Sequence, residues 1–138
     1  MSHLVKQKSE VKITDLDTLD LACQRLGLKL EKAKKTASYY GKAKTSCDAV
    51  ISCPNSDYEI ALHKQKDGSY DIEADLYCST LRNAVSHDMT GSYVEAECNK
   101  LFEAYKIQEL TGDAASNGFS SVETWDPDQQ RWVLEFER

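Results

Sequence analysis

The sequence lacks the segments that would direct a protein into or across a membrane. No apolar run approaches the roughly 18 residues of a transmembrane helix, and the first ten residues, MSHLVKQKSE, lack the apolar core of a signal peptide. These absences predict a cytoplasmic protein with no membrane partner.

Motifs of known catalytic and cofactor sites are also missing. The chain contains no phosphate-binding loop, nucleophile elbow, zinc-ligand spacing or dinucleotide-binding fingerprint. We therefore expect no cofactor and no bound metal. A non-catalytic protein is favoured, and an enzyme of unrecognised type is the last of the alternatives.

Closely spaced cysteine pairs are a further absence. The five cysteines are odd in number and include no CxxC pair, which fits reduced thiols better than a disulfide framework. Cys23 and Cys98 fall on apolar helix positions, and Cys47 and Cys53 share one face of a strand. Because free cysteine packs as a small hydrophobic residue, we expect these residues in the core. A catalytic cysteine paired with a histidine has no local motif to support it.

Length and composition are those of one soluble domain. A chain of 138 residues can bury roughly 70% of its extended surface, so it needs no disulfide or metal to fold. The net charge of −6 is unevenly spread: residues 1–44 carry ten Lys and Arg against five Asp and Glu, whereas residues 45–138 carry seven against eighteen. This polarity suits electrostatic docking to another macromolecule.

The segment 57–77 alternates apolar and polar residues on both sides of a turn, which predicts a β-hairpin. A two-residue turn would place Leu62 opposite an acidic residue and mix the two faces. A three-residue loop at 66–68 instead pairs Leu62 with Ile72. It also gives Gly68 the left-handed position, which costs glycine little. We therefore predict the register with the three-residue loop.

Periodicity elsewhere predicts two helices. Apolar residues spaced i, i+3, i+4 and i+7 indicate a helix that starts at Thr14 or Asp15 and ends at Gly27. A second helix starts at the capping box 92–95 and ends at Asn117-Gly118. Residues 79–91 are ambiguous between a loop and a short helix. Further strands are expected at 5–13, 28–30, 47–53, 119–125 and 131–137.

The order of these elements, β-α-β-β-β-β-α-β-β, predicts an α+β fold in which two helices cover one face of a largely antiparallel sheet. No linker is visible, so residues 1–138 are expected to form a single domain. The closing hairpin should carry Trp132, Leu134 and Phe136 on its apolar side. Trp125 and Trp132 are interpreted as packing residues.

Several short motifs occur in a fixed order along nearly the whole chain. They are Met1-Ser2-His3, Leu19-x-x-Ala22-x-x-x-Leu26-Gly27, Tyr40-Gly41, Cys47-Asp48-Ala49-Val50-Ile51, Tyr58-x-Ile60-x-Leu62, Asp67-Gly68-x-Tyr70, Asp75, Gly118-Phe119 and Leu134-x-Phe136. In their order and spacing, the chain resembles the uncharacterised family of the hypothetical chloroplast reading frame thirty-five, which has cyanobacterial, plastid, bacterial and phage members. The lysine-rich insert before Tyr39 and the interruption at Gly112 depart from the family pattern.

The resemblance implies a domain of unknown function, and it carries over no catalytic residue, cofactor or agreed activity. Some relatives are encoded near an ATPase of the AAA type, which implies an adaptor role with such an ATPase as a candidate partner. A plastid member would act in the stroma, and a phage member in the cytoplasm of the infected host.

The outward face of the central hairpin gathers acidic residues and one histidine. In the predicted register this face carries Glu59, His63, Asp71, Glu73 and Asp75. Glu59 would lie opposite Asp75, a like-charge pair that costs up to about 1 kcal/mol if nothing neutralises it. The leading interpretation is a solvated face, ahead of a docking surface for a basic partner. A Mg²⁺ or Ca²⁺ site comes last, because a flat strand face lacks the convergent loops of such sites.

The segment 32–44 concentrates positive charge beside two tyrosines. Its candidate partner-binding residues are Lys32, Lys34, Lys35, Tyr39, Tyr40, Lys42 and Lys44, with no acidic residue among them. Lysines can neutralise phosphates, and tyrosine rings can stack on bases. The simplest interpretation of the segment is nevertheless a solvated loop, ahead of docking to an acidic protein surface or to a phosphate-bearing ligand such as a nucleotide or RNA.

Together these features predict a non-catalytic cytoplasmic binding or adaptor module that docks a protein partner through its charge-polarised surface. The alternative is a protein that binds a nucleotide or RNA through the segment 32–44, which in a phage member would serve counter-defence. An uncharacterised enzyme ranks third.

Overall fold

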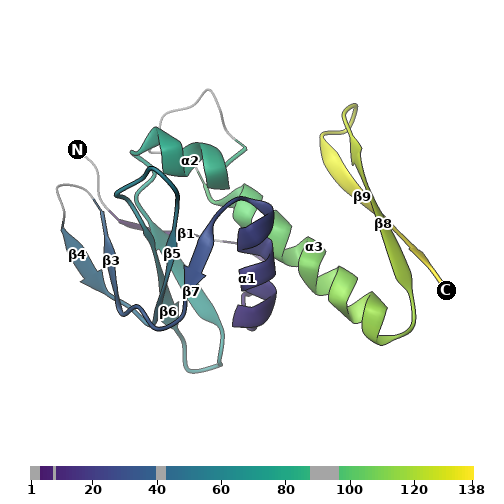
Figure 1. Cartoon of the computed structure of the whole chain (residues 1–138), viewed down its shortest axis with the longest axis horizontal. Coiled ribbons are helices and arrows are strands. Elements are labelled where there is room, and N and C mark those ends of the chain that lie inside the picture. The colour runs from purple at the N-terminus through teal and green to yellow at the C-terminus, as the bar shows by residue number, and fades with distance from the viewer. Residues whose placement is uncertain (1–3, 8, 40–42, 88–96) are drawn as a thin grey trace.

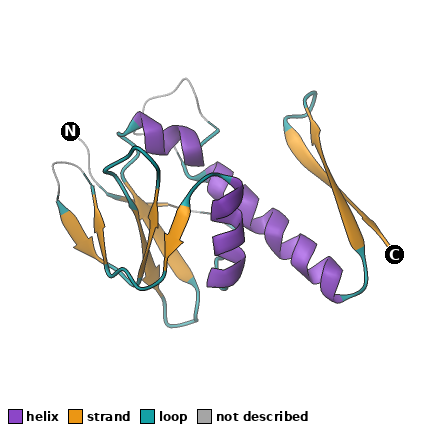
Figure 2. Ribbon diagram, viewed as in Figure 1, coloured by secondary structure: helices purple, strands orange, loops and turns teal. Residues whose placement is uncertain are grey.

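The computed structural model describes residues 4–7, 9–39, 43–87 and 97–138. Helices and antiparallel strands are both present in these residues, which confirms the α+β class expected from the sequence (Figures 1 and 2). The described strands form a central sheet and two separate small hairpins.

The central sheet has five strands within the described residues, and every neighbouring pair is antiparallel. Its strands, in spatial order, are β1 (Val5–Gln7), β7 (Tyr70–Ala74), β6 (Ile60–Lys64), β5 (Ala49–Ser52) and β2 (Lys29–Glu31). Beyond β1, Ile13 continues the same edge through an isolated antiparallel bridge to Tyr70. The expected first strand at 5–13 is therefore present in two pieces.

The hairpin of β6 and β7 has the register predicted from the sequence. Leu62 pairs with Ile72, and the N–H of Gln65 donates to the carbonyl of Ser69 at 2.7 Å, which closes a three-residue loop. Gly68 in this loop has a φ of 88°, a left-handed conformation that would strain a residue with a Cβ. Face alternation and turn chemistry were together sufficient to set the register.

Two of the described helices are those expected from periodicity. They are α1 (Leu16–Arg25) and α3 (Asn99–Ser116). The ambiguous segment contains a third, α2 (Ser79–Val85). The second predicted helix begins later than expected, because α3 starts at Asn99 with Cys98 as its N-cap and residues 97–98 are not helical. The capping box predicted at 92–95 lies outside the described residues.

The N-terminus of α1 is closed by its own cap and by a side chain of α3. Oδ1 of Asp15 accepts the N–H of Asp17 at 2.8 Å, as expected of an N-cap residue. The hydroxyl of Tyr105 accepts the N–H groups of Thr14 and Asp15 at 3.1 and 3.2 Å. Tyr105 has no exposed surface, so its hydroxyl replaces water for these two donors.

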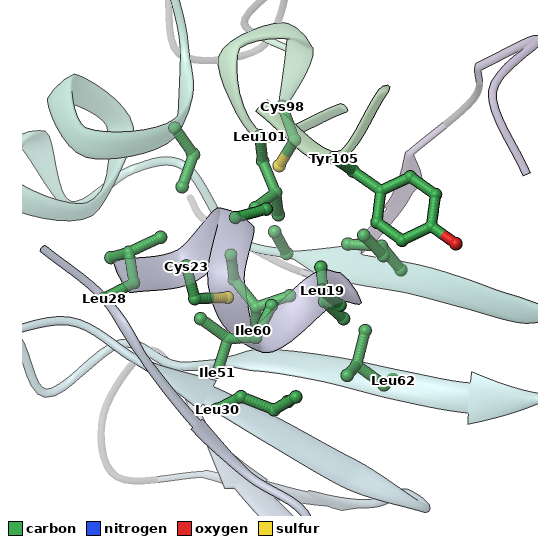
Figure 3. Packing of buried hydrophobic residues seen from close by; sticks show 14 of the residues in the cluster. Leu19, Cys23, Leu28, Leu30, Ile51, Ile60, Leu62, Cys98, Leu101 and Tyr105 are labelled. Carbon is green, nitrogen blue, oxygen red and sulfur yellow. The ribbon is translucent and has the colours of Figure 1, made fainter. Parts of the chain in front are cut away.

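The main core lies between the helices and the central sheet (Figure 3). Its fully buried members include Leu19 and Cys23 of α1, Ile60 and Leu62 of β6, and Leu101 of α3. Full burial of an aliphatic side chain of this size contributes about 1.5–3 kcal/mol. These contacts hold the two helices against one face of the sheet, as the sequence predicted.

The opposite face of the sheet is partly covered, which the sequence did not predict. The segment 32–44 contains β3 (Thr36–Ser38), which pairs with β4 (Lys44–Ser46) and packs on β5 and β6. Ala37 of β3 forms a second buried cluster with Val50 and Ala61. The middle of the sheet is therefore buried on both faces.

The closing hairpin forms as expected but does not join the central sheet. It consists of β8 (Ser120–Asp126) and β9 (Arg131–Glu137), with Trp125 paired to Trp132 across the strands. It follows α3 and stands apart from the central sheet as its own two-stranded sheet (Figures 1 and 2). Its apolar side remains partly open, since Phe136 is 41% exposed.

Candidate functional site

The lysine-rich segment is tied to the rest of the protein by its own charges. Nζ of Lys34 lies 2.6 Å from Oε2 of Glu59, and Lys35 donates to the backbone carbonyl of Asp48 at 2.7 Å. Lys32 pairs with a carboxylate of α1. Because these three lysines have internal acceptors, less positive charge is free for a partner than the sequence indicated.

The other candidates of this segment differ from one another. Tyr40 and Lys42 lie outside the described residues. Tyr39 is half-buried at the end of β3, and Lys44 has no ion pair or hydrogen-bonding side-chain partner among the described residues.

Two of the lysines line a shallow hollow. Lys34 and Lys44 lie on the walls of a space of about 380 Å³, which Asp57 and Glu59 also line. The two positive charges are therefore matched by two negative charges. This balance does not favour a phosphate-bearing ligand, which needs a surplus of positive charge.

Part of the predicted acidic face is not on the surface. Glu59 and Asp75 are only 8% and 1% exposed, which corrects the expectation of a solvated face at these positions. Oε1 of Glu59 accepts the N–H and the hydroxyl of Ser38 at 3.0 and 2.9 Å. Burial raises the pKa of Glu59, but the Lys34 ammonium and the Ser38 donors outweigh burial, so the pKa lies below its ordinary value. Oδ1 of Asp75 accepts the N–H of Tyr77 at 3.0 Å.

The remaining members of that face form separate pairwise contacts. Nζ of Lys6 lies 2.8 Å from Oδ2 of Asp71, and Nε2 of His63 contacts Oε1 of Glu73. Within the described ranges, no three His, Cys, Asp or Glu side chains are grouped so that they could hold a metal ion. The predicted acidic face is therefore a set of pairs and not a continuous acidic patch.

Ion pairs within the folded molecule bring together some of the opposite charges that are unevenly spread along the sequence. Several ion pairs join the positive segment 1–44 to the negative remainder of the chain: Lys6 with Asp71, Lys12 with Asp67, Arg25 with Glu123, and Lys34 with Glu59. Four positive charges of residues 1–44 are thus paired with four negative charges of residues 45–138 in the folded molecule. The polarity of the sequence does not require a polarised docking surface.

All five cysteines are free thiols, and their environments differ. Burial raises the pKa of both Cys23 and Cys98 to about 12, as expected for thiols packed in the core. Cys78 is half-buried and lies at the N-cap of α2. Burial raises its pKa, but the Ser56 hydroxyl at 3.4 Å and backbone N–H groups of the first turn of α2 outweigh burial. The pKa of Cys78 is therefore below its ordinary value.

A larger open space lies between the closing hairpin and the helices. This cleft has a volume of about 750 Å³, within the range of about 300–1,000 Å³ that is usual for ligand sites. Its lining residues are Arg25 and Leu26 at the end of α1, Ala84 and His87 in and after α2, Lys100, Glu103, Ala104 and Ile107 on α3, and Glu123, Trp125 and Trp132 on the hairpin. We call it the tryptophan cleft.

Arg25 connects the helices to the hairpin at this cleft. Its Nη1 donates to Oε1 of Gln108 and Oε1 of Glu123, both at 2.9 Å, and its Nη2 donates to Oε2 of Glu123 at 2.5 Å. The hydrogen-bonded guanidinium lowers the pKa of Glu123 below its usual value. The same guanidinium lies 5.9 Å from the ring centroid of Trp132, within range of a cation–π contact. One side chain thus orients both the carboxylate and the ring.

The two tryptophans form one wall of the cleft. Their ring centroids are 5.5 Å apart with an interplanar angle of 65°, an edge-to-face arrangement. Trp125 is 37% exposed and Trp132 is 38% exposed. The rings therefore support each other and still present indole surface to the solvent.

The facing wall on and near α3 is polar. Nε2 of His87 lies 3.1 Å from Oε1 of Glu103. Lys100 has no ion-pair or hydrogen-bond partner among the residues that the structure describes. Within the described part of the chain, the Lys100 ammonium on this wall is therefore without a partner, and the tryptophans form the other wall.

Sequence reasoning did not find this site. It assigned the two tryptophans to packing and gave no role to Arg25, Lys100 or Glu123. One signal was present, because the expected hairpin places Trp125 opposite Trp132. The position of that hairpin beside α1 could not be read from the sequence, since Arg25 and Glu123 are 98 residues apart.

No helix in the described part of the chain has the length and apolar character needed to cross a membrane. Comparison of the chain with protein families, with curated proteins and with solved structures finds no match. The family resemblance drawn from the sequence motifs is not tested by these comparisons and stays a prediction.

Proposed function

We propose that the protein is a non-catalytic binding module that docks a protein partner in the tryptophan cleft. The observation that carries the proposal is the pair of Trp125 and Trp132, held in place by Arg25 while more than a third of each residue stays exposed. Tryptophan and arginine are enriched among the residues that dominate binding energy at protein interfaces. A partner side chain that entered the cleft would cover both indole rings.

The charges around the cleft favour a protein segment over a nucleic acid. Arg25 and Lys100 are balanced by Glu103 and Glu123, so a polyphosphate would meet a carboxylate on each wall. A peptide with one acidic residue beside an apolar or aromatic residue fits better. Its carboxylate would pair with Lys100, and its apolar side chain would lie against the tryptophans.

The polar groups of the cleft support binding more than catalysis. The His87 ring is paired with Glu103, and no serine, threonine or cysteine is among the described residues that line the cleft. A nucleophile next to a base, the usual arrangement in covalent catalysis, is thus lacking from this lining.

Tryptophan fluorescence gives a direct test, because Trp125 and Trp132 are the only tryptophans in the chain. Displayed random peptides are selected on the immobilised protein, and each selected peptide is titrated while tryptophan emission is recorded. We expect peptides that combine an apolar or aromatic residue with an acidic one, and binding that changes the emission. Trp132→Ala should weaken binding by about 2 kcal/mol or more, the loss that defines an interface hot spot.

Val122→Ala is the matched control. Val122 is 52% exposed on the opposite face of β8, so its truncation should leave peptide affinity unchanged. Far-ultraviolet circular dichroism verifies that both variants fold. Selected peptides that bind Trp132→Ala as tightly as the wild type would show that the cleft is not the docking site.

A further inference from the structure

The outer edge of β9 has no neighbouring strand in the described structure. β9 pairs with β8 on one side only, and β8 is the strand that contacts α3. An isolated two-stranded hairpin is marginally stable in water, and an open edge is a template for another strand. The hairpin would therefore gain most from a strand added beside β9.

The sequence of β9 complements itself in the antiparallel direction. A two-fold axis through Leu134, perpendicular to the sheet, places Arg131 opposite Glu137 of a second copy at both ends of the strand. The same axis places Trp132 opposite Phe136 and Leu134 opposite its own counterpart. Opposite-charge and aromatic pairs directly across two strands are stabilising. From this complementarity we propose that two copies of the chain associate by pairing β9 with β9 in the register centred on Leu134.

Other self-pairings of the hairpin are less favourable. If β8 paired with β8 of a second copy about its middle residue, Glu123 would lie opposite Glu123 of that copy. Glu123 is also already bound to Arg25. β9 centred on Glu135 would likewise oppose two carboxylates, which is destabilising. A register centred on Val133 would pair Arg131 with Glu135 but would leave Phe136 and Glu137 without partners within β9. The Leu134 register instead pairs all seven residues of β9, with Arg131 opposite Glu137 and Val133 opposite Glu135.

The resulting sheet would have four strands, in the order β8, β9, β9, β8. The two-fold axis keeps equivalent faces on the same side, so Trp132, Leu134 and Phe136 of both copies would form one continuous band. Both tryptophan clefts would open on that side. The association uses an edge of the hairpin and the cleft uses a face, so this inference does not depend on the proposed function.

Sedimentation equilibrium of the full chain at several concentrations tests the association. We expect a reversible dimer for the wild type. Glu137→Arg should weaken the dimer about tenfold or more, because it creates two like-charge pairs per dimer. Arg131→Glu should do the same. It is combined with Asp126→Asn because Asp126 lies opposite Arg131 in its own hairpin, and a glutamate there would otherwise face an aspartate.

An equimolar mixture of the two variants provides the decisive measurement. Each reversed charge then meets the opposite charge of the other variant, so the mixture should recover dimers of near wild-type stability. Arg138→Glu makes the same change in charge just beyond the strand and should leave the dimer unchanged. A monomeric wild type, dimers that resist both reversals, or a mixture without recovery would each overturn the proposal.

Discussion

Replacing Lys34 with alanine should lower the free energy of unfolding by about 1–2 kcal/mol at neutral pH, because it leaves a buried carboxylate without its cation. The side chain of Glu59 is only 10% exposed, and Nζ of Lys34 lies 2.6 Å from its Oε2. Removing one partner from a fully buried ion pair costs about 3–5 kcal/mol. The expected loss is smaller here because the Lys34 side chain is 41% exposed and Ser38 still donates two hydrogen bonds to Glu59.

Urea denaturation followed by circular dichroism measures this loss. Lys44→Ala is the matched control, because Lys44 belongs to the same segment but has no charged partner among the described residues. Its substitution should change stability by less than about 0.5 kcal/mol. Equal stability of the two variants would refute the structural role assigned to the ion pair.

The pH dependence of stability gives a second test of Lys34→Ala. The folded-state pKa of Glu59 is lowered, so its stabilising contribution is present above the unfolded pKa of about 4.3 and is lost as pH falls through the folded pKa. Without Lys34, burial is less opposed and the pKa rises. The stability difference between wild type and Lys34→Ala should therefore be largest near neutral pH and shrink in acid. A difference that stays constant into acid would contradict this account.

Further substitutions test other contacts. Ala61→Asp and Leu62→Asp should each lower the free energy of unfolding by about 3 kcal/mol or more in denaturant, since both residues are fully buried on opposite faces of β6. An Ala61→Asp variant as stable as the wild type would show that the face carrying Ala61 is open. Tyr105→Phe should cost about 1–3 kcal/mol in thermal unfolding, because two backbone N–H groups lose their acceptor; an unchanged midpoint would mean that water replaces the hydroxyl. Cys78 should be the first thiol that iodoacetamide alkylates, as mass spectrometry of brief reactions would show. Faster labelling of Cys47 would contradict the lowered pKa of Cys78.

Features set by neighbouring residues could be predicted from the sequence. The cap of α1 depends on Asp15, and the loop of the central hairpin depends on Gly68, so local chemistry was sufficient for both. The register of Leu62 with Ile72 followed because a slip of one residue would move the whole apolar set to the other face.

Features set by residues far apart could not be predicted in this way. The alternation within 57–77 places Ala61 on the outward face of the hairpin with Glu59 and His63. Ala37 nevertheless covers it, and a single alanine carries no signal of such a contact. Glu59 looked solvated for the same reason, although Lys34 and β3 enclose it. The tryptophan cleft depends on where the hairpin lies, and Arg25 fixes that contact from the other end of the chain.

The hydroxyl of Tyr105 has a consequence for how the chain is made. It accepts the N–H of Thr14, which lies 91 residues earlier in the chain. The start of α1 therefore lacks this acceptor until α3 has been synthesised. At roughly 5–20 residues per second, that wait lasts roughly 5–20 s on the ribosome. During this time the apolar face of α1, with Leu19 and Cys23, has no α3 to pack against. Until α3 emerges, the part of α1 that α3 covers in the folded protein stays exposed on the nascent chain.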